Sequence, residues 1–226
     1  MNNIVYFDLE VSNNGKILDI GAGTGKYSVA LAKEGYDVTA VELVKSNLGT
    51  LKAKKSTVKA YQGNALDLKR FKDDSFDLTL LFGPMYHLFE EKDQLLALEE
   101  AIRITKAGGI IFAAYCSNDA TMVQYCFGRG MLKEEKYKKL VDLTTFKASA
   151  DPAELFMLYR KEDIDALMSR FKTKRLHFVG TDMATNYMRS VIDQMDDELF
   201  DLYLRYHLSI CERQDMVGYS NHILDI

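Results

Sequence analysis

The sequence has few of the features that mark metal-binding, secreted or membrane-spanning chains. Its three cysteines, Cys116, Cys126 and Cys211, lie far apart and form no C-x-x-C pair. This spacing argues against a zinc site or a disulfide framework, and predicts buried thiols in a reducing compartment. There is no run of 18 apolar residues and no basic segment followed by an apolar one at the amino terminus. We therefore expect a soluble, cytoplasmic protein without a membrane partner.

An excess of positive charge is also absent. The 226 residues carry a formal net charge of −4, with 47% hydrophobic and 27% charged residues. This composition predicts a folded chain, because disordered chains combine low hydrophobicity with high net charge. A nucleic-acid partner is not expected, because such partners usually require a basic domain. The length suits a single domain, 1–226, with room for an insertion.

Apolar stretches alternate with helical patterns along the first half of the chain. The patterns predict strands at 17–20, 36–41, 57–61, 76–82 and 109–115, and helices at 25–34, 47–55 and 93–105. Such an alternation is typical of a parallel sheet with helices on both faces, the α/β class. The second half adds helices at 161–171 and 196–213 and strands at 174–180 and 218–226.

Residues 117–152 interrupt this alternation. They contain no clear strand and one charge-rich helical piece at 132–140. We interpret them as an inserted lid that shapes a substrate site, with Gly128 and Gly130 suggesting mobility.

The first predicted strand ends in a glycine-rich turn. Asp19 is followed by Gly21, Gly23 and Gly25, and a helical pattern begins directly afterwards. Glycines at such a turn permit positive φ and let a ligand approach the backbone. The first turn of the helix has unpaired N–H groups and a positive dipole end. This arrangement predicts a site for a nucleotide-like cofactor.

Two phosphate-binding patterns do not match the turn. A dinucleotide-binding G-x-G-x-x-G would place a glycine where Lys26 stands, and a P-loop would require a glycine at Ile20 and a hydroxyl at Tyr27.

The next strand ends at Glu42, 23 residues after Asp19. A carboxylate there can accept hydrogen bonds from both hydroxyls of a ribose.

The glycine turn resembles the first motif of class I S-adenosylmethionine-dependent methyltransferases. Residues 76–88 resemble the F-D-x-[VIL]-x-x-[LF]-G-P-[LM]-Y-H-L run of a bacterial, small-molecule subgroup of that family. The resemblance covers about residues 16–115 and returns in the tail as G-x-S-x-H-x-L from Gly218 to Leu224. It implies a Rossmann-like sheet of seven strands, mostly parallel, with S-adenosylmethionine as cofactor and S-adenosylhomocysteine as product.

The resemblance also assigns roles to individual positions. The implied cofactor contacts are Asp19, Gly21, Ala22, Gly23, Gly25, Glu42, Leu43, Asn64, Ala65, Phe82 and Gly83. In the family, the acid matching Asp19 and the carbonyls matching Phe82 and Gly83 face the amino group of the cofactor. The amide matching Asn64 reads the edge of the adenine ring. No metal ligands are expected.

Tyr86 and His87 match the positions that face the transferred methyl group and the acceptor. Histidine titrates near neutral pH and can take a proton from a hydroxyl or an amine. Methyl transfer is an in-line displacement that depends largely on alignment, so the use of a base stays open. Tyr6, Tyr27 and Tyr115 are further candidates for contact with the sulfonium.

We therefore expect methyl transfer to an oxygen or nitrogen atom of an unidentified small molecule. An RNA or protein methyltransferase is the alternative that a basic face flanked by exposed aromatic residues would favour. A noncatalytic S-adenosylmethionine-binding module would keep the glycines but block the methyl-facing space. An NAD-linked oxidoreductase is disfavoured by Lys26. The sequence leaves open whether the protein is a monomer or a homodimer, and what covers the cofactor, because residues 1–15 are shorter than the family's usual helical segment.

Overall fold

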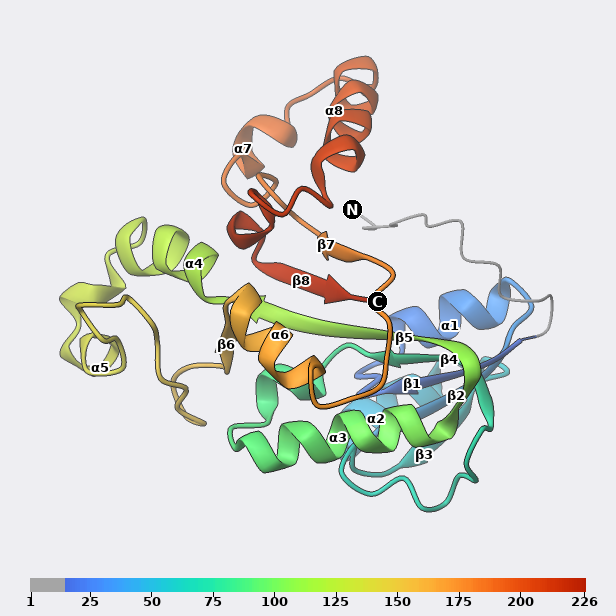
Figure 1. Cartoon of the computed structure of the whole chain (residues 1–226). Coiled ribbons are helices and arrows are strands. Elements are labelled where there is room, and N and C mark those ends of the chain that lie inside the picture. The colour runs from blue at the N-terminus through green and yellow to red at the C-terminus, as the bar shows by residue number, and fades with distance from the viewer. Residues whose placement is uncertain (1–14) are drawn as a thin grey trace. The chain divides into compact units, whose positions relative to one another are not determined.

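The computed structural model describes residues 15–226 (Figure 1), and strand β5 (Thr105–Ser117) crosses the border between two units of the chain. We call residues 15–114 together with Ile226 the N-terminal unit, and residues 115–225 the C-terminal unit. Tyr6, a candidate for contact with the sulfonium, lies outside the described residues.

Five parallel strands form the sheet of the N-terminal unit. They are β1 (Lys16–Ile20), β2 (Asp37–Glu42), β3 (Lys59–Gln62), β4 (Phe76–Leu81) and β5, in the order β3-β2-β1-β4-β5. Strands β1, β2 and β4 are almost fully buried, as expected for parallel strands that are covered on both faces. Ile17, Val38, Leu78 and Leu80 form one core cluster on this sheet.

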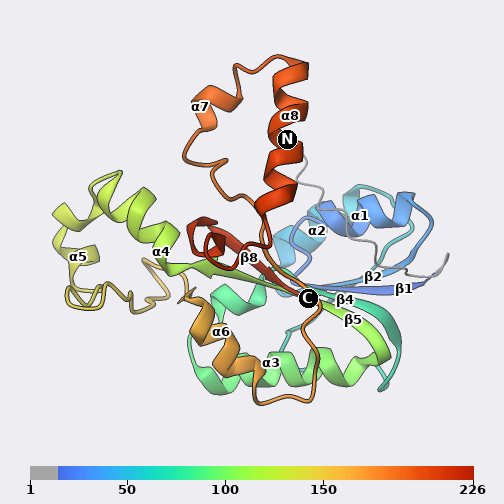
Figure 2. The same ribbon diagram turned by 45° about the horizontal axis from the view of Figure 1, so that its top comes forward.

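Helices cover both faces of this sheet, as predicted. Helices α1 (Lys26–Lys33) and α2 (Lys45–Ala53) lie on one face, and α3 (Glu91–Ile104) lies on the other (Figure 2). Parallel strands are joined by right-handed crossovers, so the direction of each step along the sheet decides which face the connecting helix covers. From β1 to β3 the chain steps in one direction, and from β4 to β5 it steps in the opposite direction, so the helices lie on opposite faces.

Strand β5 is longer than the sequence predicts. The strand contains an irregularity near its start, because Phe76 pairs with Thr105 whereas Leu78 pairs with Ile110. Gly108 has φ 77°, a conformation that residues with a side chain rarely adopt. A glycine therefore suits this bulged segment of the strand. The predicted start of the strand at residue 109 is therefore four residues late.

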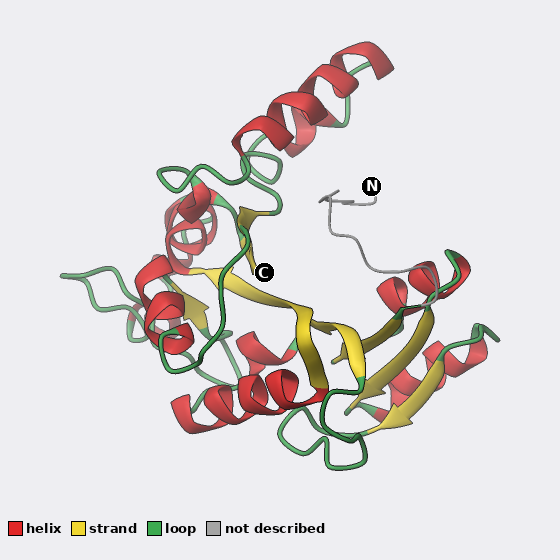
Figure 3. Cartoon of the chain, turned by 45° about the vertical axis from the view of Figure 1, so that its right-hand side comes forward, coloured by secondary structure: helices red, strands yellow, loops and turns green. Residues whose placement is uncertain are grey.

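Among the described residues, the C-terminal unit contains the strands β6, β7 and β8, drawn in yellow in Figure 3. The end of β5 pairs in parallel with β6 (Leu158–Tyr159), and β7 (Phe178–Gly180) pairs antiparallel with β8 (His222–Asp225), which follows β5 in the hydrogen-bonded order. The Rossmann-like, mostly parallel sheet is thus confirmed, with eight strands among residues 15–226 in place of the predicted seven. The extra strand, β6, has two residues, too few for an alternation pattern.

The α-helices in the described part of this unit are short, except for α8. They are α4 (Asn118–Thr121), α5 (Glu135–Lys138), α6 (Lys161–Met168), α7 (Arg189–Ile192) and α8 (Asp197–Ile210). The helix predicted at 132–140 is instead a 3₁₀ turn, Met131–Lys133, followed by α5. Across residues 15–226, no helix has both the length and the apolar composition needed to cross a bilayer.

A partly buried network of ion pairs, centred on Arg175, joins α6 to β8. Arg175 donates from Nε and a terminal nitrogen to the two oxygens of Asp225, at 2.6 and 2.7 Å, and from its other terminal nitrogen to Asp165 at 2.6 Å. Asp225 is buried, so this forked contact satisfies a carboxylate that has left water.

Candidate functional site

The three glycines of the first turn all have positive φ, at 75°, 56° and 77° for Gly21, Gly23 and Gly25. The N–H groups of Gly21 and Ala22 both donate to Val41 O, at 2.9 and 3.1 Å, which joins the turn to the end of β2. Residues with a side chain rarely adopt this conformation, so the backbone alone explains why all three positions are glycine.

The surroundings of the three glycines differ. A Cβ on Gly21 would lie 2.8 Å from Pro84 Cδ, and one on Gly25 would lie 2.2 Å from Leu51 Cδ1. A Cβ on Gly23 would have no atom within 4 Å. Gly21 and Gly25 are therefore needed for packing, whereas Gly23 faces open space in which another molecule can approach the backbone.

The Glu42 carboxylate lies at the open glycine. It is 5% exposed, and it accepts hydrogen bonds from Gly23 N at 2.7 Å and from Val44 N at 2.8 Å, one on each oxygen. Each oxygen retains a further acceptor position, which suits the two hydroxyls of a ribose. Leu43, the next residue, is 58% exposed and offers an apolar side chain at the same edge.

Asp19 is buried at the end of β1. It accepts a hydrogen bond of 2.5 Å from the hydroxyl of Ser28, on α1. Burial raises the pKa of Asp19 to about 6, against the lowering effect of Ser28, and the charge of Glu42 adds to the rise. The cost of burying this carboxylate would fall if a cationic group bound beside it.

Asn64 and Ala65 follow β3 at the same edge, because Glu42 pairs with Gln62. The Asn64 side-chain oxygen accepts a hydrogen bond from Leu66 N at 3.1 Å, so its amide nitrogen is the group available to a ligand. Asn64 is exposed and Ala65 is buried. The chain forms no helix between this turn and β4, so Asp67, two residues after Ala65, caps no helix.

The loop after β4 packs on the glycine turn. A Cβ on Gly83 would lie 3.4 Å from Gly21 O, and the next residue is Pro84, which touches Gly21. The chain then forms a 3₁₀ helix, Pro84–His87. Two motifs more than 60 residues apart in sequence thus meet at one edge of the sheet.

The side chains of this loop are partly engaged with each other. The Tyr86 hydroxyl donates to Phe82 O at 2.6 Å, which leaves that carbonyl one acceptor position for a ligand. The rings of Tyr86 and His87 have centroids 5.0 Å apart, and His87 is exposed. Tyr27 packs edge-on against Phe82, with centroids 5.0 Å apart, and is 44% exposed.

Tyr115 is not available for ligand contact, contrary to the sequence-based expectation. It is fully buried in the C-terminal unit, and its ring packs edge-on against Tyr159 at 5.0 Å. The three cysteines are buried with free thiols, as predicted. Among residues 15–226, no cluster of His, Cys, Asp or Glu side chains is suited to hold a metal ion.

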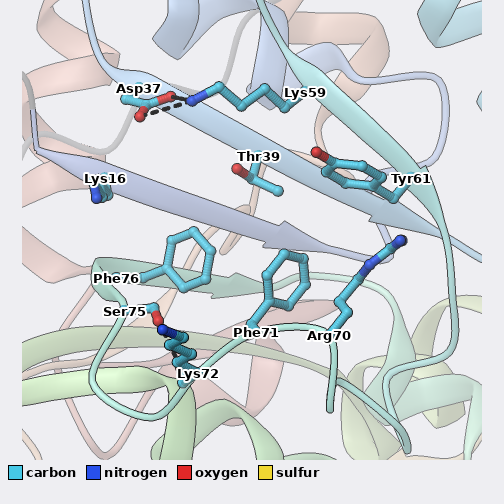
Figure 4. Close-up of a pocket in the computed structure, with 10 residues that line it drawn as sticks. All are labelled: Lys16, Asp37, Thr39, Lys59, Tyr61, Arg70, Phe71, Lys72, Ser75 and Phe76. Atoms are coloured by element: carbon cyan, nitrogen blue, oxygen red, sulfur yellow. Dashed lines mark hydrogen bonds and ion pairs between the residues drawn. The ribbon is translucent and has the colours of Figure 1, made fainter.

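A shallow cavity lies at the opposite edge of the N-terminal sheet (Figure 4), a feature that sequence reasoning missed. It has a volume of about 270 Å³ and is lined by Lys16, Asp37, Thr39, Lys59, Tyr61, Arg70, Phe71, Lys72, Ser75 and Phe76. Lys59 forms an ion pair with Asp37 at 2.7 Å, and the Arg70 guanidinium lies 4.2 Å from the centre of the Tyr61 ring. Its residues come from the amino ends of β1, β2 and β4, from β3 and from the loop before β4.

Comparison with known proteins locates the family relationship in the N-terminal unit. Residues 18–113 match the model of a family described as a methyltransferase domain. A protein of Geobacillus sp. (strain WCH70) named as a methyltransferase is 34% identical over 101 residues, which cover 42% of this chain and 40% of that protein. The demethylmenaquinone methyltransferase of Paenarthrobacter aurescens (strain TC1) is 33% identical over 115 residues, 51% of this chain and 44% of that enzyme. The matches thus span about half the length, or less, of these curated relatives.

The fold matches solved structures over more of the chain. A S-adenosylmethionine-dependent methyltransferase of Methanosarcina mazei superposes with a TM-score of 0.59 and 19% identity, covering 74% of this chain and 84% of that protein. The chemistry of the turn agrees with this cofactor, because the open backbone at Gly23 and the buried carboxylates of Asp19 and Glu42 suit its amino acid and ribose groups. Residues 18–113 are therefore similar to methyltransferase domains, and the fold is shared with solved S-adenosylmethionine-dependent methyltransferases.

Proposed function

We propose that the protein transfers a methyl group from S-adenosylmethionine to an oxygen or nitrogen atom of a small molecule, by in-line displacement. The observation that carries the proposal is the open backbone of Gly23 beside the buried carboxylate of Glu42. Ligands of open α/β sheets bind at the carboxyl ends of the strands, and this pair lies there.

Each cofactor group has a counterpart at this edge. Glu42 would accept hydrogen bonds from the ribose hydroxyls, and Gly21, Ala22, Gly23 and Gly25 would line the methionine part. Asp19 and the carbonyls of Phe82 and Gly83 would receive the amino group. Leu43, Asn64 and Ala65 would contact the adenine ring, the first through its exposed apolar side chain.

The chain's contribution to the reaction is mainly alignment. The bound cofactor supplies an activated methyl group on a positively charged sulfur. Because that charge disappears as the methyl group leaves, excluding water and holding the acceptor in line supply much of the acceleration. Tyr86 and His87 are the candidate side chains toward the acceptor. We retain segment 117–152 as the candidate lid.

A small-molecule acceptor is supported by the relatives. One of them is named as a demethylmenaquinone methyltransferase, and its match covers half of this chain. The acceptor of this protein is not taken from that name, because the match covers 44% of that enzyme.

A second candidate, an RNA methyltransferase, is favoured by the cavity at the opposite edge. Lys16, Lys59, Arg70 and Lys72 line it beside aromatic rings, a combination that suits phosphate and base contacts. It ranks second because Asp37 neutralises Lys59 and because the cavity lies at the edge opposite the glycine turn.

Calorimetry and a methylation assay test the proposal. S-adenosylmethionine and S-adenosylhomocysteine should bind, and NAD should not. With labelled S-adenosylmethionine, label should pass into small hydroxyl or amino compounds and not into bulk RNA or protein. NAD binding without S-adenosylhomocysteine binding would contradict the proposal, and labelled RNA would favour the second candidate.

A further inference from the structure

The cavity shown in Figure 4 combines positive charge with aromatic side chains, and all of its lining belongs to the N-terminal unit. Four cationic side chains and one carboxylate line it, which leaves a formal excess of three positive charges. The whole chain, in contrast, carries a net charge of −4. A hollow lined mainly by one sign of charge concentrates ions of the opposite sign. The cavity is therefore suited to an anion.

Three of the four cations, Lys16, Arg70 and Lys72, have no carboxylate partner within residues 15–226. Asp37, the one acid of the lining, is paired with Lys59 at 2.7 Å. The carboxylate of Asp77, which lies beside Lys16, is engaged by Lys106 Nζ at 2.6 Å and by the backbone N–H of Lys16 at 2.8 Å. The positive charge of the lining is thus not balanced from within this unit.

The alternation of side chains along β2 and β3 places the polar lining on one face of the sheet. Val38 and Val58 pack with the core cluster that includes Leu31 and Ala32 of α1. Successive side chains of a strand point to opposite faces, so Asp37, Thr39 and Lys59 lie on the face turned away from α1. Thr39 is 7% exposed and contributes a hydroxyl to the lining.

Helix α3 fixes the loop that carries Arg70. Glu100 accepts a hydrogen bond from Leu68 N at 2.6 Å, and Arg103 donates to Phe71 O at 3.1 Å. Arg103 also donates to Glu100 at 2.7 Å, so the two α3 side chains hold each other. Arg70 lies between two anchored residues, and ordering its backbone therefore costs a ligand little.

The guanidinium of Arg70 is held by aromatic rings. It lies 4.2 Å from the centre of the Tyr61 ring and 5.9 Å from the centre of the Phe71 ring. Contact with a ring face leaves the N–H groups at the edge of the guanidinium able to donate. A forked donor of this kind, oriented and without a carboxylate, suits a phosphate group, which it can bind through two parallel hydrogen bonds.

The aromatic side chains form a continuous wall. The Tyr61 and Phe71 rings have centroids 6.4 Å apart, the Phe71 and Phe76 rings 5.3 Å, and both pairs meet edge to face. Tyr61 is 39% exposed. Accessible aromatic side chains beside cationic ones are typical of sites where the bases of nucleotides stack.

We propose that this cavity binds a nucleoside monophosphate, with its phosphate on the Arg70 guanidinium near Lys16 and Lys72 and its base against Tyr61 and Phe71. A phosphate monoester carries a charge of about −1.5 to −2 at pH 7, which matches the excess of positive charge better than the single charge of a phosphodiester or a carboxylate. The volume of about 270 Å³ suits one nucleotide rather than a dinucleotide.

This site is distinct from the one proposed for the cofactor. Its lining includes none of Gly23, Glu42 and Asn64. The inference therefore goes beyond the proposed function, and it stands or falls separately from methyl transfer.

Calorimetry with the full chain tests the inference. The probes are adenosine and uridine monophosphate, the two nucleosides, inorganic phosphate, and a short oligoribonucleotide with and without a 5′-phosphate. S-adenosylhomocysteine is kept in excess, so that an adenine ring cannot bind at the glycine turn instead. Both monophosphates should bind more tightly than the nucleosides or inorganic phosphate, and the phosphorylated oligonucleotide should bind no better than they do.

Two variants of the lining are compared with a matched control. Arg70→Gln should weaken monophosphate binding by about 10- to 100-fold, the range for losing hydrogen bonds to a charged group. Tyr61→Leu should weaken it by about 5- to 100-fold through lost stacking, with a smaller loss for inorganic phosphate. Lys69→Gln removes the same charge from the neighbouring residue, whose side chain is 87% exposed and outside the lining, and should leave the affinity as in the native chain.

Several results would overturn the inference. Displacement of the monophosphates by S-adenosylhomocysteine would place them at the glycine turn. Equal affinities for monophosphates and inorganic phosphate would exclude recognition of the base, and equal losses in Arg70→Gln and Lys69→Gln would leave only a general effect of charge. Tighter binding of the phosphorylated oligonucleotide would assign the cavity to the end of an RNA strand.

The inference also has a test that needs no variant, in case Tyr61→Leu or Arg70→Gln fails to fold. Adding uridine monophosphate to the native chain should shift the NMR signals of the Tyr61 ring and of Arg70 Nε–H. Binding that leaves both signals unchanged would place the nucleotide elsewhere.

Discussion

The backbone N–H of Gly23 donates a hydrogen bond of 2.7 Å to the carboxylate of Glu42, 19 residues along the chain. This contact joins the open part of the glycine turn to the end of the neighbouring strand. One carboxylate thus orders the loop and presents its remaining acceptor positions to a ligand.

Glu42→Ala should weaken S-adenosylhomocysteine binding by about 1–3 kcal/mol, the range for losing a buried, charged hydrogen-bond partner. Calorimetry measures the loss. Asp37→Ala is the matched control, because Asp37 begins the same strand at the opposite edge and pairs with Lys59. Equal affinities for the two variants would show that the ribose is held elsewhere.

The glycines of the turn should respond differently to alanine. Gly25→Ala should destabilise the fold most, because its Cβ would meet Leu51 at 2.2 Å, whereas Gly23→Ala should cost only the strain of positive φ, about 1–2 kcal/mol. Denaturant unfolding measures both.

Gly35→Ala provides the control for Gly23→Ala, because Gly35 also has positive φ, at 99°, and open space at its Cβ position, but lies at the other end of α1. Gly23→Ala should reduce S-adenosylhomocysteine affinity and Gly35→Ala should not. Parallel behaviour of these two variants in binding would show that no ligand approaches Gly23.

The raised pKa of Asp19 predicts a dependence of stability on pH. Its folded pKa of about 6 exceeds the ordinary 3.8, so between these values the folded state binds more protons than the unfolded state. The contribution of Asp19 to the free energy of unfolding is therefore greatest below pH 4. It falls by about 3 kcal/mol as the pH rises to about 6. Asp19→Asn should remove this fall, and denaturant titrations at pH 4 and pH 7 measure it.

Binding should depend on pH in the opposite direction. If the cofactor's ammonium group lies beside Asp19, only the ionised carboxylate attracts it, so S-adenosylhomocysteine affinity should rise between pH 5 and 7 and release a proton below pH 6. Asp19→Asn should flatten this profile. An affinity that falls over the same range in the native chain would place the ammonium group elsewhere.

Asn118 should anchor the candidate lid. It is fully buried, donates to Phe146 O and accepts from Ala148 N, both at 2.9 Å, and so ties residues 146–148 to the end of β5. Asn118→Ala leaves these backbone groups unpaired, at a cost of about 1–3 kcal/mol each. Limited proteolysis within 140–150 should accelerate and turnover should drop, with S-adenosylhomocysteine affinity retained.

The control for this change is Lys136→Ala, which removes an exposed ion pair with Glu154 in the same segment. Exposed pairs contribute little, so proteolysis should stay at the native rate. If Asn118→Ala also kept that rate and full turnover, residues 117–152 would not act as a lid.

The parts of the fold that were predictable from sequence are those that depend on neighbours along the chain. The alternation of apolar runs located β1, β2, β4 and most of α1 to α3, because a buried parallel strand and an amphipathic helix each need a characteristic local pattern. The spacing of Gly21, Gly23 and Gly25 similarly indicated positive φ, which all three adopt.

The predictions from sequence were wrong or incomplete where contacts between residues far apart in the chain decide the structure. Helix α8 was predicted from its local pattern, but that pattern did not reveal that Leu199, Leu202 and Tyr206 are each about half exposed within the described part of the chain. Tyr115 was a candidate ligand contact, but packing against Tyr159 buries it. Strand β6 exists only because two residues pair with the end of β5.

The sequence by itself determined the glycine turn and the acids that end β1 and β2, because backbone conformation and strand ends are local properties. Only the tertiary structure decided that Pro84 packs on Gly21 and that the Tyr86 hydroxyl donates a hydrogen bond to the Phe82 carbonyl. It also decided that Asp182 lies within hydrogen-bond distance of His222, 40 residues further along the chain. Such contacts depend on how strands and loops come together in the folded protein. The number of residues between two side chains in the sequence does not give the distance between them after folding.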